Sequence, residues 1–247
     1  MQTDAALDLA QAMQMFYGNC DTKSQTSIAQ LPQWESNSPA ADQQQVTVRP
    51  LFNAFSGDAG AKRFTLVTYA ISPDCVSHAC APTIGMAVFS KKGLKWTMDA
   101  SNRAVTHLGA WGKPPADVKV VEVGPGHRAV EDVGGGQGET TKLLQLLIPW
   151  NGTVNLGLSR IIADNDLGAC GSEGALPCYE NHREVNFIRN DRAGFYNLEL
   201  ELKGTDLVGT HTKEVHGVET LKMENGKYVQ VSRQGDLATA DGALAER

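Results

Sequence analysis

The pattern of apolar and polar residues changes once along the chain, near residue 45. From Asp4 to Tyr17, apolar residues recur at helical spacing, so this segment predicts one amphipathic helix that Asp4 caps and Gly18 ends. Residues 22–45 are rich in Gln, Ser, Ala, Asn and Pro and lack a core-forming pattern, which predicts a long loop. The chain therefore divides into an N-terminal helix and long loop, residues 1–45, and a single β domain, residues 46–247.

After residue 45, short β-branched and aromatic runs alternate with Gly-rich turns, which is typical of strands. The predicted strands are 46–48, 63–70, 84–89, 94–98, 118–123, 128–132, 143–148, 154–162, 184–188, 195–203 and 228–232. Within this β region, only residues 101–111 also suggest a helix. The fold class expected is mainly β, a propeller-like or sandwich-like antiparallel meander with one short N-terminal helix.

The charge balance argues against nucleic acid as a partner. The 247 residues carry a net charge of -6 and no Lys/Arg-rich block, whereas nucleic-acid binders present a basic face to the phosphates. We therefore expect no nucleic-acid partner. The sequence also holds no apolar run of about 18 residues, so no membrane-spanning helix is expected.

Four of the five cysteines form two local pairs. Cys75 and Cys80 bracket one turn-rich segment, and Cys170 and Cys178 bracket another. Such pairs predict disulfides and an oxidising compartment. A zinc site fits less well, because the longer spacing is a poor second zinc knuckle. Cys20 is left over, either free or paired with one of the other four.

The disulfides imply export, which we expect to be periplasmic. No signal peptide opens the sequence, so we expect that a cleaved signal preceded it.

Three motifs suggest ligand sites and have simpler interpretations. Residues 124–129 match the dinucleotide fingerprint G-x-G-x-x-A, but the glycines that follow leave no room for the helix it requires. In the Gly-rich stretch 134–140, Glu139 stands where a phosphate-binding loop needs Lys. Residues 164–168 resemble the front of a calcium loop, but its terminal carboxylate position holds Ala175. We expect turns at all three places and no cofactor or metal, although calcium at Asp164 and Asp166 stays open.

A complete catalytic motif is also missing. The chain has no G-x-S-x-G nucleophile elbow. His211 and His216 lie five residues apart, which places them on opposite faces of a strand. Glu199 and Glu201 share a strand face, and such pairs are usually solvated. We expect no enzymatic activity.

The segment after Cys170 has the character of a binding loop. A disulfide would stiffen it, so that little entropy is lost on docking, and Tyr, His and Arg are frequent interface anchors. The residues we expect to contact a partner, with Tyr179 donating its hydroxyl to a carboxylate, are Glu173, Tyr179, His182 and Arg183, joined on the same exposed side by Gly135 and Gln137 of the Gly-rich stretch. The alternative is that the disulfide only protects an exported loop.

The middle of the chain resembles a known group of proteins. The resemblance runs from 116 to 202 and rests on a short series of segments: Gly124-Pro125-Gly126-His127-Arg128-Ala129-Val130, the Gly-rich stretch, Leu143-Leu144-Gln145-Leu146-Leu147-Ile148, Leu156-Gly157, a Cys-containing Asn/Asp-rich loop and Gly194-Phe195-Tyr196-Asn197-Leu198. This order is similar to periplasmic β domains that include lipoprotein immunity proteins, which protect a cell from its own lysozyme-like effectors of antibacterial type IV secretion. Those proteins are described as β-propeller-like.

The resemblance implies a function and a partner. It implies a periplasmic immunity protein that blocks a peptidoglycan-cleaving, lysozyme-like effector by inserting a loop into its active-site cleft, and that is attached to a membrane through an N-terminal lipid. A surface of net negative charge would speed approach to a basic hydrolase. The alternative is a non-catalytic ligand-binding or structural β domain of the cell envelope.

Overall fold

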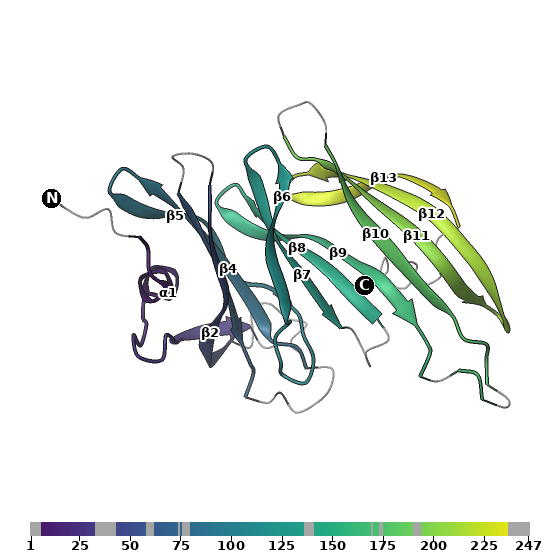
Figure 1. The fold of residues 1–247 in the computed structure, drawn as a ribbon. Coiled ribbons are helices and arrows are strands. Elements are labelled where there is room, and N and C mark those ends of the chain that lie inside the picture. Colours follow the sequence, from purple (N-terminus) through teal and green to yellow (C-terminus); the bar gives the residue numbers. More distant parts are fainter. Residues whose placement is uncertain are drawn as a thin grey trace.

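A computed structural model describes residues 6–32, 43–57, 62–73, 75, 80–135, 141–168, 170–172, 175–189 and 194–236. These residues form one helix and thirteen strands (Figure 1). The strands join into one hydrogen-bonded sheet that is antiparallel except at a single parallel contact between β5 and β9. The predicted class, a mainly β antiparallel meander of the sandwich type with one short helix, is confirmed.

Helix α1 (Leu9–Tyr17) is shorter than the sequence predicts. Asp8 caps it, because its carboxylate accepts from the Gln11 backbone at 2.7 Å while the Gln11 side chain accepts from the Asp8 backbone. The predicted start was therefore wrong, and Asp4 itself lies outside the described residues. The predicted end at Gly18 is correct, since Gly18 takes the left-handed conformation at φ 81° and closes the last turn.

Five strands form what we call the N-terminal layer: β1 (Ser27–Pro32), β2 (Gln43–Ser56), β3 (Arg63–Ala70), β4 (Thr83–Lys92) and β5 (Lys95–His107). They pair in chain order. Two sequence predictions fail here, because β1 lies inside the predicted loop and the predicted helix at 101–111 is largely the second half of β5.

Four strands form the middle layer: β6 (Asp117–Gly124), β7 (His127–Gly135), β8 (Thr141–Trp150) and β9 (Thr153–Asn165). The last four form the C-terminal layer: β10 (Glu180–Ile188), β11 (Asn197–Val208), β12 (His211–Glu224) and β13 (Lys227–Gly235). Strand β12 was not predicted. Only short contacts join the layers along the sheet, one residue pair between β5 and β9 and three between β9 and β10.

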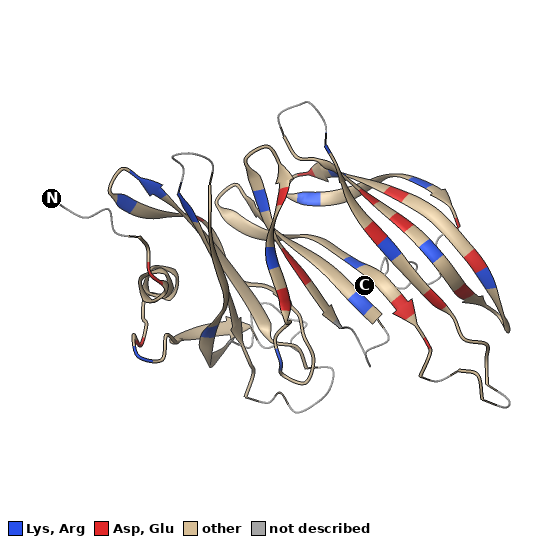
Figure 2. Ribbon diagram, in the orientation of Figure 1, with Lys and Arg blue, Asp and Glu red and all other residues tan. Residues whose placement is uncertain are grey.

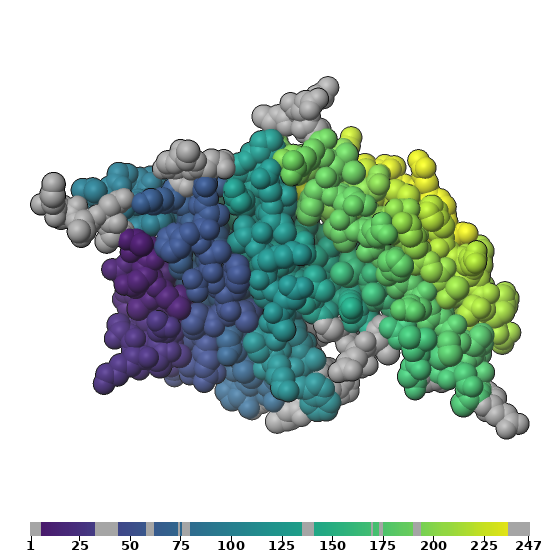
Figure 3. All heavy atoms as spheres, in the orientation of Figure 1, coloured from purple at the N-terminus to yellow at the C-terminus, as the bar shows by residue number. Residues whose placement is uncertain are grey.

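Because these connections are narrow, the sheet folds back on itself and its layers stack. Along β3, Phe64 and Leu66 pack under α1, whereas Val67 points to the opposite side and meets Val130 and Leu147 of the middle layer. The other face of the middle layer packs on the C-terminal layer through a second core. Figures 1 and 3 show the resulting order of α1 and the three layers across the molecule.

The outward face of the C-terminal layer is charged. Figure 2 shows acidic and basic residues side by side along β10, β11 and β12. Lys203 lies 3.1 Å from Glu184 and 3.1 Å from Glu201, and Glu201 also contacts His216 at 3.2 Å. Glu201 thus belongs to a surface ion-pair network whose Lys203 lowers its pKa. This is the solvated face that the sequence predicted for Glu199 and Glu201.

Candidate functional site

Both predicted disulfides are present. Cys75 bonds to Cys80 and Cys170 bonds to Cys178, with Cα atoms 5.5 Å and 4.9 Å apart. Cys20, whose state the sequence left open, is a free cysteine. Two disulfides indicate an oxidising, extracytoplasmic compartment.

The Cys170–Cys178 loop lies at the same end of the molecule as the β7–β8 connection. Antiparallel pairing decides this, because Gly135 is opposite Lys142, Thr141 is opposite Asp164, and Asn165 is opposite Glu180. We call this end, formed by the described residues among 134–142 and 164–182, the disulfide edge. Gly135 lies at this edge, whereas Gln137 and Glu173 lie outside the described residues, and the contact of these residues with a partner stays a prediction.

The carboxylate of Asp164 connects residues of the disulfide edge through hydrogen bonds. Asp164 accepts a hydrogen bond from the Thr141 hydroxyl at 2.9 Å and another from the Tyr179 hydroxyl at 3.2 Å. The Tyr179 backbone donates to Asp166 at 2.8 Å. Partial burial and the Asp164 charge raise the pKa of Tyr179 to about 12, so its hydroxyl stays a donor at neutral pH. The Tyr179 hydroxyl, which we expected to donate to a carboxylate of a partner, thus donates to a carboxylate of its own chain, and a partner contact by Tyr179 stays a prediction.

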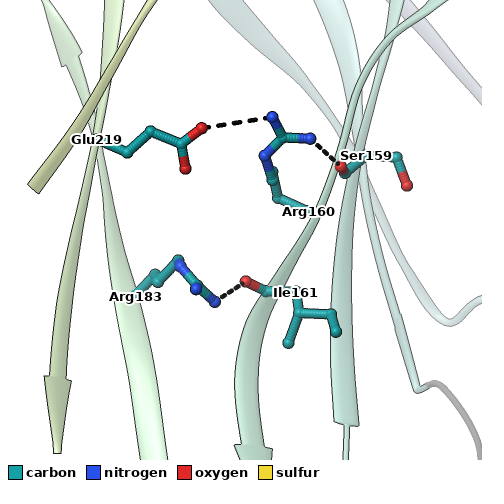
Figure 4. A network of polar contacts seen from close by, with 5 residues as sticks. All are labelled: Ser159, Arg160, Ile161, Arg183 and Glu219. Carbon is teal, nitrogen blue, oxygen red and sulfur yellow. Dashed lines mark hydrogen bonds and ion pairs between the residues drawn. The ribbon is translucent and has the colours of Figure 1, made fainter. Parts of the chain in front are cut away.

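His182 and Arg183 point in opposite directions. His182 is exposed on the outer face, whereas the side chain of Arg183 turns inward and is 5% exposed. The Arg183 guanidinium donates to the backbone oxygen of Ile161 at 2.6 Å, across the gap where β9 and β10 separate (Figure 4). In this structure Arg183 holds two layers together, and a partner contact by its guanidinium stays a prediction.

A second polar contact bridges the same gap. Arg160 of β9 lies 3.3 Å from Glu219 of β12 and also donates to the backbone oxygen of Ser159 at 3.0 Å (Figure 4). Glu219 is almost completely buried. The C-terminal layer is thus fixed to β9 by two arginines, which keeps the start of β10 at the disulfide edge in place.

The carboxylates of the candidate calcium loop make hydrogen bonds within the protein. Among the described residues, no group of three or more His, Cys, Asp and Glu side chains could hold a metal ion. The Asp164 oxygens bind Thr141 and Tyr179, and Asp166 binds the Tyr179 backbone. These carboxylates stabilise the loop through hydrogen bonds.

The opposite end of the layers carries a cleft that the sequence did not reveal. It has a volume of about 230 Å³. Its walls come from all three layers, and the residues that give it chemical character are Arg63, Asp99, His127, Arg128, Trp150 and Phe195. The β6–β7 and β8–β9 turns lie beside it, through Gly126 and residues 151–152. Since those turns are at the other ends of the strands from the disulfide edge, the two sites are separate.

Ring stacking and one arginine shape this cleft. The His127 ring stacks on Phe195 with centroids 4.2 Å apart, and Trp150 lies 5.8 Å from Phe195. The Arg63 guanidinium donates to the backbone oxygen of Gly126 at 2.9 Å and so joins the N-terminal layer to the β6–β7 turn. Burial, and then the charge of Arg63, lower the pKa of His127.

Close backbone approach explains two glycines around the cleft. A Cβ at Gly124 would lie 2.2 Å from the Gly194 oxygen, so only glycine lets the middle layer meet the segment before Phe195. A Cβ at Gly226 would lie 2.7 Å from the Trp150 ring. The only sequence signal for the cleft was the segment Gly124–Ala129, which was correctly predicted to be a turn.

Comparison of the chain with protein-family models, with curated proteins and with solved structures found no match. No helix in the described part of the chain is both long and apolar enough to cross a membrane. The function is therefore argued from the disulfide edge and the cleft.

Proposed function

We propose that this chain is a periplasmic immunity protein that inhibits a peptidoglycan-cleaving, lysozyme-like effector. The disulfide edge would cover the active-site cleft of the enzyme. The observation that carries the proposal is that a disulfide-closed loop and the adjoining ends of β7 and β8 lie at one end of a layered scaffold. The proposal also rests on the resemblance of residues 116–202 to periplasmic immunity proteins.

The disulfide edge has the stiffness that an inserting loop requires. Inside the loop, the Gly171 backbone donates to the Leu176 oxygen at 3.4 Å and the Ala175 backbone donates to the Ser172 oxygen at 2.9 Å. Together with the disulfide and the contacts of Asp164, these bonds restrain the described residues of the loop before binding. A preordered loop loses less conformational entropy on docking and therefore binds more tightly.

Two exposed leucines give this edge an apolar contact surface. Leu176, inside the disulfide loop, is 47% exposed, and Leu167, just before it, is 56% exposed. Apolar side chains that remain in solvent on a stiff loop are suited to a protein interface. In the proposed complex, Leu176 enters the enzyme cleft and His182 lies at the rim, where it can donate to an acidic group. Tyr179 and Asp164 keep the loop in shape.

The test is inhibition of purified lysozyme-like hydrolases, measured as clearing of a peptidoglycan suspension. Leu176→Asp places a charge where an apolar contact is proposed, next to catalytic carboxylates, so we expect inhibition to weaken at least about tenfold. The matched control is Leu94→Asp, because Leu94 is 71% exposed in the β4–β5 turn. Both variants should melt at the wild-type temperature.

Three results would contradict the proposal. The first is that the wild-type protein inhibits none of the lysozyme-like hydrolases. The second is that the two leucine variants inhibit equally well. The third is that the purified protein itself clears peptidoglycan, with activity that survives repeated purification.

A further inference from the structure

We propose that the cleft between the three layers binds a small oxyanion-bearing ring compound, such as a sugar that carries a carboxylate or a phosphate. This inference does not rest on the inhibitor proposal, because the cleft and the disulfide edge lie at opposite ends of the layers. It would add a ligand-binding site to the protein.

The first reason is charge. Two guanidinium groups, those of Arg63 and Arg128, line the cleft beside the imidazole of His127. The acidic residue in the lining, Asp99, is 3.6 Å from the ammonium group of Lys92 and is thus partly neutralised. Arg128 also has an interaction of its own, so Arg63 is the residue that supplies the positive charge for this proposal, in a chain with a net charge of -6. Within a recess, such charges attract anions more strongly than on an open surface.

The second reason is the orientation of Arg63. Its bond to the backbone oxygen of Gly126, 2.9 Å long, fixes the guanidinium at the wall of the cleft. An arginine carries five N–H donors in a planar fork, and this bond uses one of them. The fork matches the two oxygens of a carboxylate or of a phosphate, which makes arginine the usual residue for such groups.

The third reason is the aromatic wall. Phe195 lies between His127 and Trp150, with ring centroids 4.2 Å and 5.8 Å away. Flat apolar rings beside cationic groups offer one surface for a ring and another for its charge. The floor is apolar, formed by Met86, Val88 and Val120. A bare inorganic anion would leave this apolar part of the cleft unused.

The fourth reason is size. The cleft has a volume of about 230 Å³. That is room for one ring with its substituents, and it is below the usual range for drug-sized ligands. The ligand class is therefore a monosaccharide-sized anion.

The experiment uses the whole chain and three probes. N-acetylmuramic acid carries a carboxylate, glucosamine 6-phosphate carries a phosphate, and N-acetylglucosamine is the neutral control. Binding is measured by calorimetry and by tryptophan fluorescence, to which Trp150 of the cleft contributes together with three other tryptophans. We expect at least one anionic probe to bind with a dissociation constant below about 1 mM, and the neutral probe to bind at least about tenfold more weakly.

Variants locate the binding. Arg63→Gln removes one guanidinium and should weaken anion binding at least about tenfold. Arg49→Gln is the matched control, because Arg49 is exposed on β2 and does not line the cleft. Should Arg63→Gln fail to fold, Ser56→Asp serves instead, since Ser56 lines the cleft and a carboxylate there would repel the ligand.

Each result of the binding experiment either supports or overturns the proposed ligand site. Binding of the carboxylate alone, of the phosphate alone or of both supports the proposal and identifies the source of the oxyanion. The proposal is overturned if neither anion binds, if the neutral sugar binds equally well, or if the cleft variants bind like the Arg49→Gln control. Because Leu176→Asp should leave this binding unchanged, failure here is distinguishable from failure of the inhibitor proposal.

Discussion

The middle layer is covered on both faces, and the two interfaces treat buried charge differently. Towards the N-terminal layer, the core holds one acidic side chain, Asp132, which is fully buried. Towards the C-terminal layer, the apolar core gives way near the disulfide edge to the Arg160–Glu219 ion pair and to Arg183. The interface with the N-terminal layer thus contains Asp132 without a hydrogen-bond partner among the described residues, whereas the interface with the C-terminal layer contains Glu219 paired with Arg160.

The surroundings of Asp132 explain its state. It points towards the N-terminal layer together with Val130, and its neighbour across the strands is Gln145, also buried. Neither Asp132 oxygen has a hydrogen-bond partner among the described residues. Burial, and then the charge of Asp117, raise the pKa of Asp132 to about 7. The folded protein therefore holds this carboxyl in its neutral form below that pH.

At the other interface, the buried acidic side chain has a cationic partner. Arg160 is partly exposed and reaches inward to Glu219, so the ion pair is only half removed from water. The comparison teaches that the same fold buries carboxyl groups in two ways: by neutralisation where no cation is near, and by ion pairing where the layers separate. The stability that depends on the first interface should change with pH. The stability that depends on the second should fall when either member of the Arg160–Glu219 pair is removed.

The largest expected effect is that of Asp132→Asn. In the unfolded chain Asp132 loses its proton near its ordinary pKa of 3.8, whereas the folded chain keeps it to about pH 7. Between these values the folded state binds more protons, so stability falls as pH rises. Because a tenfold change in an ionisation constant corresponds to about 1.4 kcal/mol, the whole loss amounts to about 4 kcal/mol. Asn has no charge to lose, so the variant should gain about this much over the wild type between about pH 4 and about pH 8.

Urea unfolding at several pH values measures this difference. The control is Asp117→Asn, because Asp117 is exposed and raises the pKa of Asp132 only as the second cause. Its effect should be a small part of that of Asp132→Asn. A stability difference between wild type and Asp132→Asn that does not change with pH would show that Asp132 is ionised in the folded protein.

A smaller effect is expected from Glu219→Gln at the other interface. The change leaves the Arg160 guanidinium without its counter-charge in a partly buried position, which should cost about 2 kcal/mol. The matched control is Glu201→Gln in the exposed network with Lys203 and His216, whose effect should be small and should vanish at high salt.

A double variant sharpens the test. Because removal of both partners leaves no buried charge, Arg160→Met with Glu219→Leu should be far less destabilising than Glu219→Gln alone. Equal losses of stability for Glu219→Gln and Glu201→Gln would mean that burial of Glu219 adds nothing to the pair.

The sequence predicted strands well wherever buried residues are apolar and alternate. The predicted strand 63–70 matches β3 at both ends, because β-branched and aromatic residues face a core on both sides of this strand. Strand β1 was missed because its pattern is inverted, with Ser27 and Ala29 buried and Ile28 exposed. Strand β12 was missed because Gly217 and Glu219 occupy inward positions on it.

Irregular strand pairing explains why the second half of β5 was not predicted to be a strand. A shift of register opposite Ile84 and Met86 interrupts the alternation, and Asn102 uses its side chain to bond the Val154 oxygen at 3.1 Å and the Ala104 backbone at 3.0 Å. The apolar residues then fall at a spacing that resembles a helix. A period-based prediction cannot detect a bulge that depends on the partner strand.

Some features of the disulfide edge and none of the cleft could be predicted from the sequence, because only local spacing can be read from it. Local spacing was sufficient for both disulfides, since each closes a short loop. Whether a given side chain faces in or out was not predictable from residue type, as the inward position of Arg183 shows. The cleft could not be predicted, because Arg63, Arg128 and Phe195 come from three layers and are far apart in the chain.

The smallest expected effects on stability come from two buried tyrosines, one in α1 and one in the C-terminal layer. Tyr17 of α1 shares a hydrogen bond of 2.7 Å with the Thr68 hydroxyl, and Tyr228 of β13 donates to the Tyr196 oxygen at 3.1 Å. Burial raises the pKa of both hydroxyls, so neither ionises at neutral pH. Each Tyr→Phe change therefore removes one buried hydrogen bond, worth about 1 kcal/mol.

The two substitutions differ in what happens to the hydrogen-bond partner that each tyrosine leaves behind, and this difference decides which one lowers stability more. After Tyr17→Phe, the Thr68 hydroxyl can still donate to the Gly85 oxygen, 3.4 Å away. After Tyr228→Phe, the Tyr196 oxygen loses a buried donor between the middle and C-terminal layers, where the Tyr196 backbone already binds the Val123 oxygen at 2.8 Å. We therefore expect Tyr228→Phe to lower the free energy of unfolding more than Tyr17→Phe. The reverse order in denaturant unfolding would show that the helix contact, and not the C-terminal layer, depends more on its buried hydroxyl.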